Sequence, residues 1–258
     1  MERKLEEKYG LTEALIAVPA YEQSSDQEVA FQAVDYILRV LKKNMVFGMT
    51  WGRAMHEFVE QLAKDERLRS LSFQNVKVVP FLGTPGAIQS DSWNTTTYSN
   101  TLATKVGNLL HCASYNLSAP MYVEGTKEKE LIESIDEIAK VLHMAETADI
   151  ALIGIGSMQD DSSIIKAEIR TREEYKELVR KGAVGEIVGR IYDKNGQTVD
   201  EDLKRKMVGI SLDKIAKIPV RVGMSYGKDK IEAIKGAIAG GLVNVLVTDV
   251  PTAELLLK

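Results

Sequence analysis

Short runs of valine, isoleucine and leucine alternate along the chain with longer segments in which apolar residues recur every three or four positions. The short runs are typical of strands buried on both faces of a parallel sheet, and the longer segments are typical of helices with one buried side. This alternation predicts an α/β fold, a three-layer α/β/α sandwich built on a mostly parallel, Rossmann-like sheet. The expected strands are 14–20, 45–50, 76–83, 120–124, 150–156, 186–193, 220–225 and 244–249.

The segments between the expected strands predict the helices and the domain organisation. Two stretches, 157–166 and 194–209, have no clear period, so we expect a small subdomain to be inserted there. No stretch rich in proline, glycine or serine is long enough to separate two domains, and we therefore expect residues 1–258 to form one domain. The expected helices are 26–43, 52–64, 95–114, 127–147, 171–181, 212–218, 228–239 and 252–257.

The composition excludes several classes of protein. The chain of 258 residues carries 33 lysines and arginines against 37 aspartates and glutamates, and this net charge of −4 does not suit a domain that binds nucleic acid through bulk charge. Its single cysteine, Cys112, cannot form an internal disulfide, so we expect a reducing compartment, the cytoplasm. No apolar stretch reaches the roughly 18 residues that span a bilayer, and the opening segment lacks the apolar core of a signal peptide.

Candidate ligand contacts lie where strands run into helices. The carboxyl ends of parallel strands meet at one edge of a sheet, and the helices that begin there present free N–H groups to anions. In MVFGMTWGRAM, the expected strand ends just before Trp51, Gly52 and Arg53. The glycine permits close approach of the backbone, and the guanidinium is suited to a phosphate. A tight turn with an exposed arginine is the alternative interpretation.

Two further junctions have the composition of anion sites. In VVPFLGTPGAIQ, Gly83, Thr84 and Gly86 offer small side chains, a hydroxyl and accessible amides, although such loops also simply turn corners. In VRVGMSYGKDKIEAIKG, Gly227 precedes a helix with lysines in its first turn, among them Lys230. Lysines in a first turn oppose the helix dipole, a placement that an anion nearby would explain. Solvated lysines in a charged loop are the alternative there.

Other cofactor and catalytic motifs do not occur in the sequence. The glycine pair in ADIALIGIGS lacks the third glycine of a dinucleotide fingerprint, and neither GxxxxGK[ST] nor GxSxG is found. The three histidines share no metal-ligand spacing with Cys112 or with a carboxylate pair, so we expect neither a metal nor a cofactor. Four carboxylates near strand ends are candidates for contacts to sugar hydroxyls or for acid and base, with salt bridges and helix caps as the alternative. They are Glu186, Asp193, Asp249 and Glu254.

Six segments, taken in order, resemble those of a known family. They are KYGLTEALIAV, VFGMTWGRAM, TYSNTLATKVG with YNLSAPMYVE, ADIALIGIGS, KGAVGEIVGRIYDKNG and the terminal YGKDKIEAIKGAIAGGLVNVLVTDVPTAELLL. In this order they resemble the sugar-binding effector domain of the SorC family (SorC/DeoR-like) of bacterial transcriptional regulators. The resemblance covers nearly the whole chain, and the terminal block is the most diagnostic of the six segments.

The resemblance implies a fold and a function. The fold would be similar to that of glucosamine-phosphate deaminases, ribose-phosphate isomerases and CoA transferases, used here to bind phosphorylated sugars and not to convert them. Members normally carry an N-terminal helix-turn-helix domain. We therefore expect this chain to be the effector domain of a longer homodimeric or homotetrameric regulator, which binds DNA through that absent domain. A natural stand-alone domain is the alternative.

The family roles carry over to individual residues of this chain. Gly227 and Lys230 resemble the glycine-lysine phosphate clamp of the family, and Glu186 resembles a contact to sugar hydroxyls or to the phosphate region. Some members place paired threonines where this chain has Arg53 and Ala54, so its phosphate contacts are expected to run through the guanidinium, or its effector to differ. The ligand-binding residues implied by the resemblance are Trp51, Gly52, Arg53, Gly83, Thr84, Glu186, Gly227 and Lys230.

Two functions follow from these observations. The first is a sensor domain without catalytic activity, whose occupancy by a sugar or sugar phosphate controls DNA binding. The second is an enzyme of the same fold, a sugar-phosphate isomerase, deaminase or transferase with Glu186 or Asp193 as the base, because a fold does not fix a function. A helix-turn-helix encoded directly upstream of this chain would favour the sensor.

Overall fold

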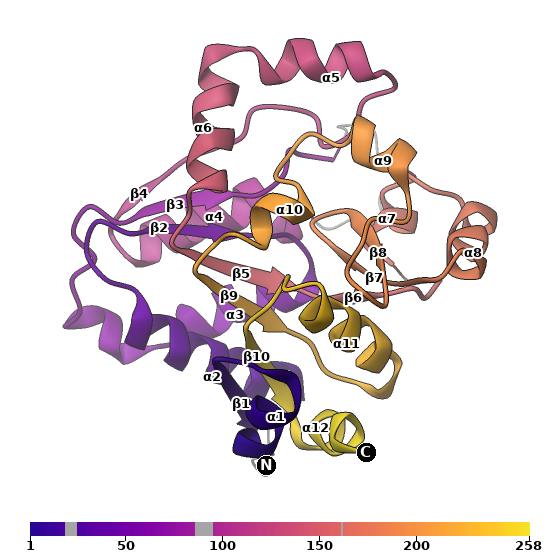
Figure 1. Cartoon of the computed structure of the whole chain (residues 1–258). Helices are drawn as coiled ribbons and strands as arrows, with labels where there is room; N and C mark the ends of the chain where they lie inside the picture. The colour runs from indigo at the N-terminus through magenta and orange to yellow at the C-terminus, as the bar shows by residue number, and fades with distance from the viewer. Residues whose placement is uncertain (19–24, 86–94, 161) are drawn as a thin grey trace.

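A seven-stranded sheet forms the centre of the fold, and each strand is parallel to its neighbours (Figure 1). The computed structural model describes residues 1–18, 25–85, 95–160 and 162–258. The strand order is β1-β10-β9-β5-β2-β3-β4, which confirms the expected α/β sheet. The strands are β1 (Glu13–Ala17), β2 (Val46–Met49), β3 (Lys77–Pro80), β4 (Ala113–Ser114), β5 (Ile150–Gly154), β9 (Val220–Met224) and β10 (Val245–Asp249).

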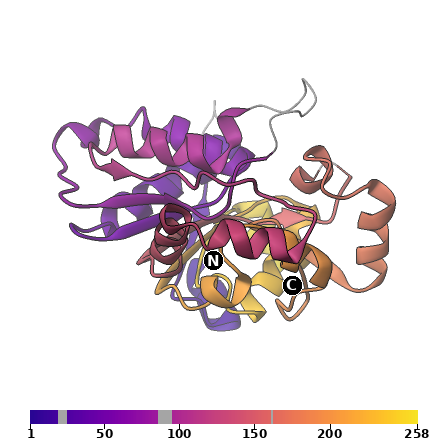
Figure 2. The same cartoon turned by 90° about the horizontal axis from the view of Figure 1, so that it is seen from above.

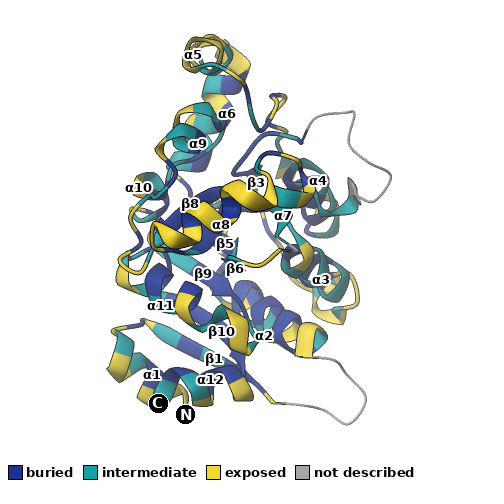
Figure 3. Ribbon diagram, turned by 90° about the vertical axis from the view of Figure 1, so that its right-hand side faces the viewer, coloured by how far each residue is buried: buried dark blue, intermediate teal, exposed yellow. Residues whose placement is uncertain are grey.

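Helices cover both faces of the sheet and complete the three layers. In β5, Ile150 and Leu152 belong to one buried cluster, whereas Ala151 and Ile153 belong to another on the opposite face. Burial on both faces is why β5 is an unbroken apolar run in the sequence, and in Figure 3 the outer sides of the helices carry the exposed residues. One face is covered by α2 (Ser25–Val40), α3 (Arg53–Leu62) and α4 (Ser99–Leu109), and the other by α1 (Glu2–Tyr9), α6 (Asp136–Glu146), α11 (Ile231–Ala239) and α12 (Val250–Leu257).

A smaller antiparallel sheet is inserted between β5 and β9, and Figure 2 shows it at the side of the main sheet. The prediction of one continuous strand over 186–193 is wrong. Val188 and Gly189 adopt φ angles of 54° and 68°, and this pair of positive angles reverses the chain into a two-residue hairpin turn. The unit comprises β6 (Gly156–Ser157), β7 (Ala183–Ile187) and β8 (Arg190–Asp193), with α7 (Ser163–Lys166) and α8 (Arg172–Arg180).

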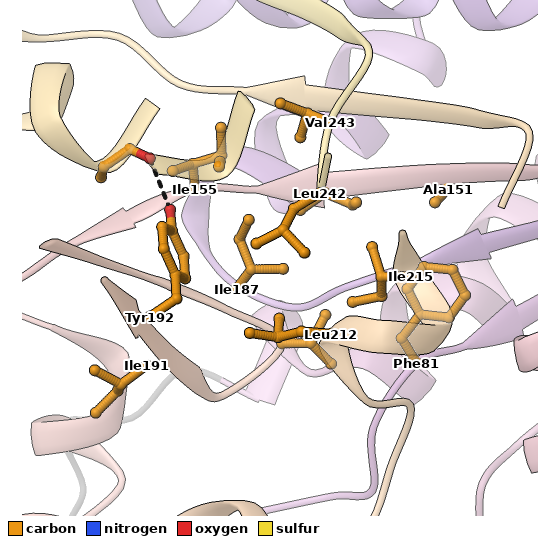
Figure 4. Close-up of a cluster of buried hydrophobic side chains, with 14 of the residues drawn as sticks. Phe81, Ala151, Ile155, Ile187, Ile191, Tyr192, Leu212, Ile215, Leu242 and Val243 are labelled. Atoms are coloured by element: carbon orange, nitrogen blue, oxygen red, sulfur yellow. Dashed lines mark hydrogen bonds between the residues drawn. The ribbon is translucent and has the colours of Figure 1, made fainter. Parts of the chain in front are cut away.

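The small sheet packs closely against the main body through α11. The hydroxyl of Tyr192 donates a hydrogen bond to the carbonyl oxygen of Ala233 at 2.9 Å, within a buried cluster that includes Ile155 and Ile187 (Figure 4). A Cβ atom on Gly185 would lie 2.4 Å from the Tyr192 hydroxyl oxygen, so the glycine allows this close packing. The side chains of β7 therefore have fixed positions relative to the main sheet.

Two of the expected helices have different limits in the structure. The helix expected over 127–147 is divided into α5 (Thr126–Glu133) and α6, because Ile135 between them is extended. The helix expected over 95–114 ends earlier, and a left-handed residue, His111 with φ 51°, precedes the edge strand β4. The remaining elements are α9 (Glu201–Lys206), α10 (Leu212–Ile215) and the 3₁₀ turns η1 (Glu66–Arg69), η2 (Thr95–Thr97) and η3 (Lys228–Lys230).

Some expectations fall outside the described residues, namely the end of the first expected strand at 19–20 and the contribution of Gly86 to the second junction. Within the described part of the chain, none of the helices combines the length and the apolar character that crossing a bilayer requires.

Candidate functional site

The candidate site lies where the winding of the sheet changes direction. Strands β2 and β5 are neighbours, yet the chain continues from β2 to β3 and β4, and from β5 to β9 and β10 on the other side. Open α/β sheets bind ligands outside the carboxyl ends of the strands at such a switch point. Trp51 follows β2 and Gly156 follows β5, so both residues lie at this edge of the sheet.

Trp51 and Glu186 meet at the switch point, although Trp51 follows a strand of the main sheet and Glu186 lies in the small sheet. The indole N–H of Trp51 donates a hydrogen bond to the Glu186 carboxylate, and the Gly189 amide donates to its Oε1 at 2.5 Å. A Cβ atom on Gly156 would lie 2.9 Å from Glu186 Oε2, so this glycine makes room for the carboxylate. Both partners are buried, with 5% of Trp51 and 7% of Glu186 exposed, and the contact links the main sheet to the small one.

Lys230 approaches the same place from the turn after β9. Its Nζ donates a hydrogen bond to Ser157 Oγ at 3.0 Å, and Ser157 Oγ donates to Asp229 Oδ2 at 2.9 Å. The charge of Lys230 is near enough to favour the ionised form of Glu186. Three of the residues singled out in the sequence, Trp51, Glu186 and Lys230, are thus brought together from three separate segments of the chain.

Burial gives Glu186 an unusual titration. Removal from water raises the pKa of its carboxyl from 4.5 to about 6, although the Gly189 amide, the Lys230 charge, the Trp51 indole and the Arg190 charge all act in the opposite direction. The unfolded chain ionises this carboxyl at a lower pH, so the folded state binds more protons between about pH 4.5 and pH 6. The contribution of Glu186 to stability is therefore fully present below pH 4.5 and is lost as the pH rises through about 6.

This titration leads to a prediction for Glu186→Gln, which keeps an acceptor for both N–H donors but cannot ionise. The free energy of unfolding of the wild type, relative to that of the variant, is expected to fall by about 2 kcal/mol between pH 4 and pH 7. Urea denaturation at a series of pH values measures this difference. Glu254→Gln, at an exposed carboxylate on α12, serves as the control. Parallel curves for wild type and Glu186→Gln would contradict the prediction.

Gly52, Arg53 and Gly227 lie at turns of the same edge. Gly52 has a φ of 105° and its amide donates to Thr97 O at 3.0 Å, while Gly227 has a φ of 106° and its amide donates to Thr252 Oγ1 at 2.7 Å. Residues with a Cβ rarely adopt such angles, so both turns require glycine. Arg53 is exposed at the start of α3, and its charge reaches Tyr226, the residue before Gly227. A ligand binding role for these three residues stays a prediction.

Gly83 and Thr84, in the segment that follows β3, pack against two other segments of the chain, one around Ala119 and one around Val208. The Gly83 amide donates to Val208 O at 3.1 Å, and Thr84 Oγ1 accepts a hydrogen bond from Asn100 Nδ2 at 2.8 Å. The strand expected over 120–124 is wrong, because this segment only forms isolated bridges, one of them to Thr84. Within the described residues, the contacts of Gly83 and Thr84 run to this packing region and not to the cluster of Trp51, Glu186 and Lys230. Their role in ligand binding also stays a prediction.

Three polar residues of the site escaped the sequence reasoning. Ser157 and Asp229 flank Lys230, and Ser157 directly follows the glycine pair of ADIALIGIGS, which is the signal that could have pointed to it. Arg190 is 3% exposed; its Nη2 donates to Met207 O and Gly209 O, whereas Nε and Nη1 have no hydrogen-bond partner among the described residues. Burial lowers the Arg190 pKa to about 10, against the charges of Glu133 and Glu186. The pattern of hydrophobic and polar positions does not predict that an arginine is buried, so Arg190 could not be found from the sequence.

Two of the other candidate carboxylates, Asp193 and Asp249, have structural roles, whereas Glu254 is exposed on α12. Asp193 Oδ1 accepts hydrogen bonds from the amides of Asn195 and Gln197, each at 2.9 Å, and fixes the turn after β8. Asp249 caps α12 by accepting from the Thr252 amide at 2.9 Å. In the portion of the chain that the structure describes, no three histidine, cysteine or acidic side chains are grouped so as to hold a metal ion.

A parallel α/β domain with polar side chains converging on its switch point is the architecture of a ligand-binding domain, and the comparisons with known proteins identify its family. Residues 1–258 match the family described as "Putative sugar-binding domain". The chain is 30% identical over 262 residues to the sorbitol operon regulator of Klebsiella pneumoniae, covering 100% of this chain and 80% of that protein. It is 25% identical over 257 residues to the deoxyribonucleoside regulator of Bacillus subtilis strain 168, covering 98% of this chain and 78% of that protein.

The solved structures agree with these matches. The full-length sorbitol operon regulator SorC of Klebsiella pneumoniae superposes with a TM-score of 0.87 at 28% identity, covering 100% of this chain and 80% of that chain. The chain therefore belongs to the sugar-binding domain family of SorC-type transcriptional regulators, and the resemblance noted in the sequence is confirmed.

Proposed function

We propose that this domain senses a sugar phosphate, which it binds at the switch point of the sheet without converting it. The observation that carries the proposal is the convergence of Lys230 Nζ, held 3.0 Å from Ser157 Oγ, with the buried Glu186 carboxylate that accepts from Trp51. An ammonium is a strong partner for a phosphate oxygen, and a carboxylate accepts hydrogen bonds from sugar hydroxyls. Arg53, Gly227 and the loop of Gly52 would complete the contacts to the ligand.

The signalling role follows from the family. The relatives are named as operon and nucleoside regulators, so we place the DNA-binding function in a further domain of a longer, cytoplasmic protein that acts as a homodimer or homotetramer. The effector would bind one arrangement of the subunits more tightly than another. A coupling of about 1–3 kcal/mol, typical of allosteric proteins, changes the affinity for DNA by about 5- to 150-fold.

A thermal shift screen with paired sugars and sugar phosphates tests the proposed function. Binding to the native state stabilises it by about 2.7 kcal/mol at a ligand concentration of 100 times Kd, so a true effector gives a large rise in Tm. We expect at least one sugar phosphate to raise the Tm more than its unphosphorylated counterpart. A response confined to the uncharged sugars would show that Lys230 does not select an anion, and no response to any member of a broad panel would count against a sugar effector altogether.

One observation supports the enzyme as a second candidate. The Glu186 carboxyl has a pKa of about 6, the range that general bases use near neutral pH. The hydrogen bonds from Gly189 and Trp51 hold this carboxylate in a fixed position. A fixed carboxylate suits a general base, and it equally suits an acceptor of hydrogen bonds from sugar hydroxyls. Proton NMR of the sugar phosphate that binds separates the two functions, because the sensor leaves the spectrum unchanged over hours, whereas an isomerase or deaminase produces new signals.

A further inference from the structure

Asp229 lies next to Lys230 in an arrangement that fixes both charges. The two side chains share Ser157, whose hydroxyl accepts from Lys230 Nζ at 3.0 Å and donates its only proton to Asp229 Oδ2 at 2.9 Å. The distance between Lys230 Nζ and Asp229 Oδ2 is 3.9 Å. A Cβ atom on Gly227 would lie 2.9 Å from Asp229 Oδ1, so this carboxylate lies directly beside the glycine-lysine turn. The cation of the candidate site thus has a carboxylate as its permanent neighbour.

We propose that Asp229 is a specificity-determining residue, which lowers the affinity of the site for bare phosphate and selects ligands that carry hydroxyl groups next to their anionic group. This inference rests on the proposed function, because it concerns the ligand of the same site. Asp229 acts through its charge on the ligand and on Lys230, and Ser157 is the residue that holds the two side chains in register.

The physical basis is the difference between a phosphate and a sugar phosphate at this place. Lys230 Nζ lies 3.9 Å from Asp229 Oδ2, so the negative charge of a phosphate bound at Lys230 is repelled by the Asp229 carboxylate. A sugar hydroxyl is a neutral donor, so it can donate to Asp229 while the phosphate group stays at Lys230. Hydrogen phosphate carries its single proton on the dianion itself, so it can donate to Asp229 only by bringing its two negative charges beside the carboxylate. Building an unfavourable contact against the wrong ligand is a common route to specificity. Inorganic phosphate, the simplest competing anion, is rejected in this way.

The exposure of Asp229 makes the proposal testable without disturbing the fold. Its side chain is 44% exposed, against 23% for Lys230, so a ligand can reach it and a substitution removes little buried surface. Asparagine has the same shape as aspartate, and its Oδ1 can still accept the hydrogen bond from Ser157. Asp229→Asn therefore changes the charge beside Lys230 and leaves the rest of the arrangement in place.

The test is the affinity for inorganic phosphate at pH 8, measured by NMR titration of the wild type, Asp229→Asn and Glu232→Gln. Glu232 lies in the first turn of α11, directly after η3, and its Oε1 is paired with Lys235 Nζ at 3.0 Å, so its variant removes one negative charge without touching Lys230. We expect Asp229→Asn to bind phosphate about tenfold more tightly than the wild type, and Glu232→Gln to bind it as the wild type does. The advantage of Asp229→Asn should shrink between 20 mM and 300 mM sodium chloride, because salt screens the removed repulsion.

Two other outcomes separate this proposal from the proposed function. If the wild type binds phosphate and Asp229→Asn binds it equally well, or if Glu232→Gln gains as much as Asp229→Asn, the specificity role of Asp229 is wrong while the anion site stands. If none of the three proteins binds phosphate at tens of millimolar, neither the specificity role nor the anion site around Lys230 is correct.

Discussion

Replacing Gly83 with alanine is expected to destabilise the domain by about 3 kcal/mol. The added Cβ would lie 2.5 Å from Ala119 O and 2.7 Å from Pro120 O. Both contacts are to backbone atoms, which cannot rotate away as the end of a side chain can. The Gly83 amide also donates a hydrogen bond to Val208 O at 3.1 Å, so the segment that follows β3 cannot shift freely without losing that hydrogen bond. The backbone at Ala119 and Pro120 therefore has to move to accept one methyl group.

Urea denaturation of Gly83→Ala measures this loss, with Gly125→Ala as the matched control. A Cβ at Gly125 meets nothing within 4 Å, and its backbone φ of −133° is open to any residue. The control is therefore expected to stay within about 0.5 kcal/mol of the wild type. A Gly83→Ala variant as stable as Gly125→Ala would contradict the close approach of Gly83 to the backbone of Ala119 and Pro120.

Lys230→Ala is expected to weaken the binding of a phosphorylated effector by roughly 10- to 150-fold, or about 1.5–3 kcal/mol. The variant removes the cation that would face the phosphate. It also leaves the Asp229 carboxylate, 3.9 Å from Lys230 Nζ in the wild type, without that counter-charge. The unphosphorylated form of the same sugar should lose much less, because its contacts do not depend on the ammonium.

Calorimetric titration with the sugar phosphate found by thermal shift measures the effect of Lys230→Ala. Lys228→Ala is the control, since Lys228 is exposed in the same 3₁₀ turn and keeps the net charge of the two variants equal. A similar loss in both variants would mean that only the overall charge of the turn matters. An affinity unchanged in Lys230→Ala would contradict the placement of the phosphate at this residue.

The strand pattern predicted most of the main sheet, because each central strand is buried on both faces and appears as a continuous apolar run. The hairpin of β7 and β8 could not be predicted in the same way. Its turn is Val188–Gly189, and Val188 has a φ of 54°. Valine rarely adopts a positive φ, so its presence in the sequence does not predict a turn. In the run 186–193, Gly189 and Arg190 stand between two apolar pairs, Ile187–Val188 and Ile191–Tyr192, and no Asn-Gly or Asp-Gly pair indicates a turn.

The candidate site was predictable where the chain carries a strand-to-helix junction. Trp51 and Lys230 lie in the segments that connect β2 and β9 to the next helices, and the parallel topology brings such junctions to one edge. Ser157 and Asp229 were missed because a serine and an aspartate in loops are common, and their hydrogen bonds depend on the inserted sheet. The lysines of the η3 turn also have a local explanation, since Asp229 between them offsets part of their charge.

The indole N–H resonance of Trp51 tests the central claim most directly, because this group donates to Glu186 at the point where the segments converge. The chain contains two tryptophans, so a Trp93→Phe variant assigns the signal. On titration with the sugar phosphate of largest thermal shift, the account predicts that the Trp51 indole resonance moves in step with binding and saturates at the same Kd. An indole resonance that stays in place while the ligand saturates the protein would show that the sugar binds elsewhere.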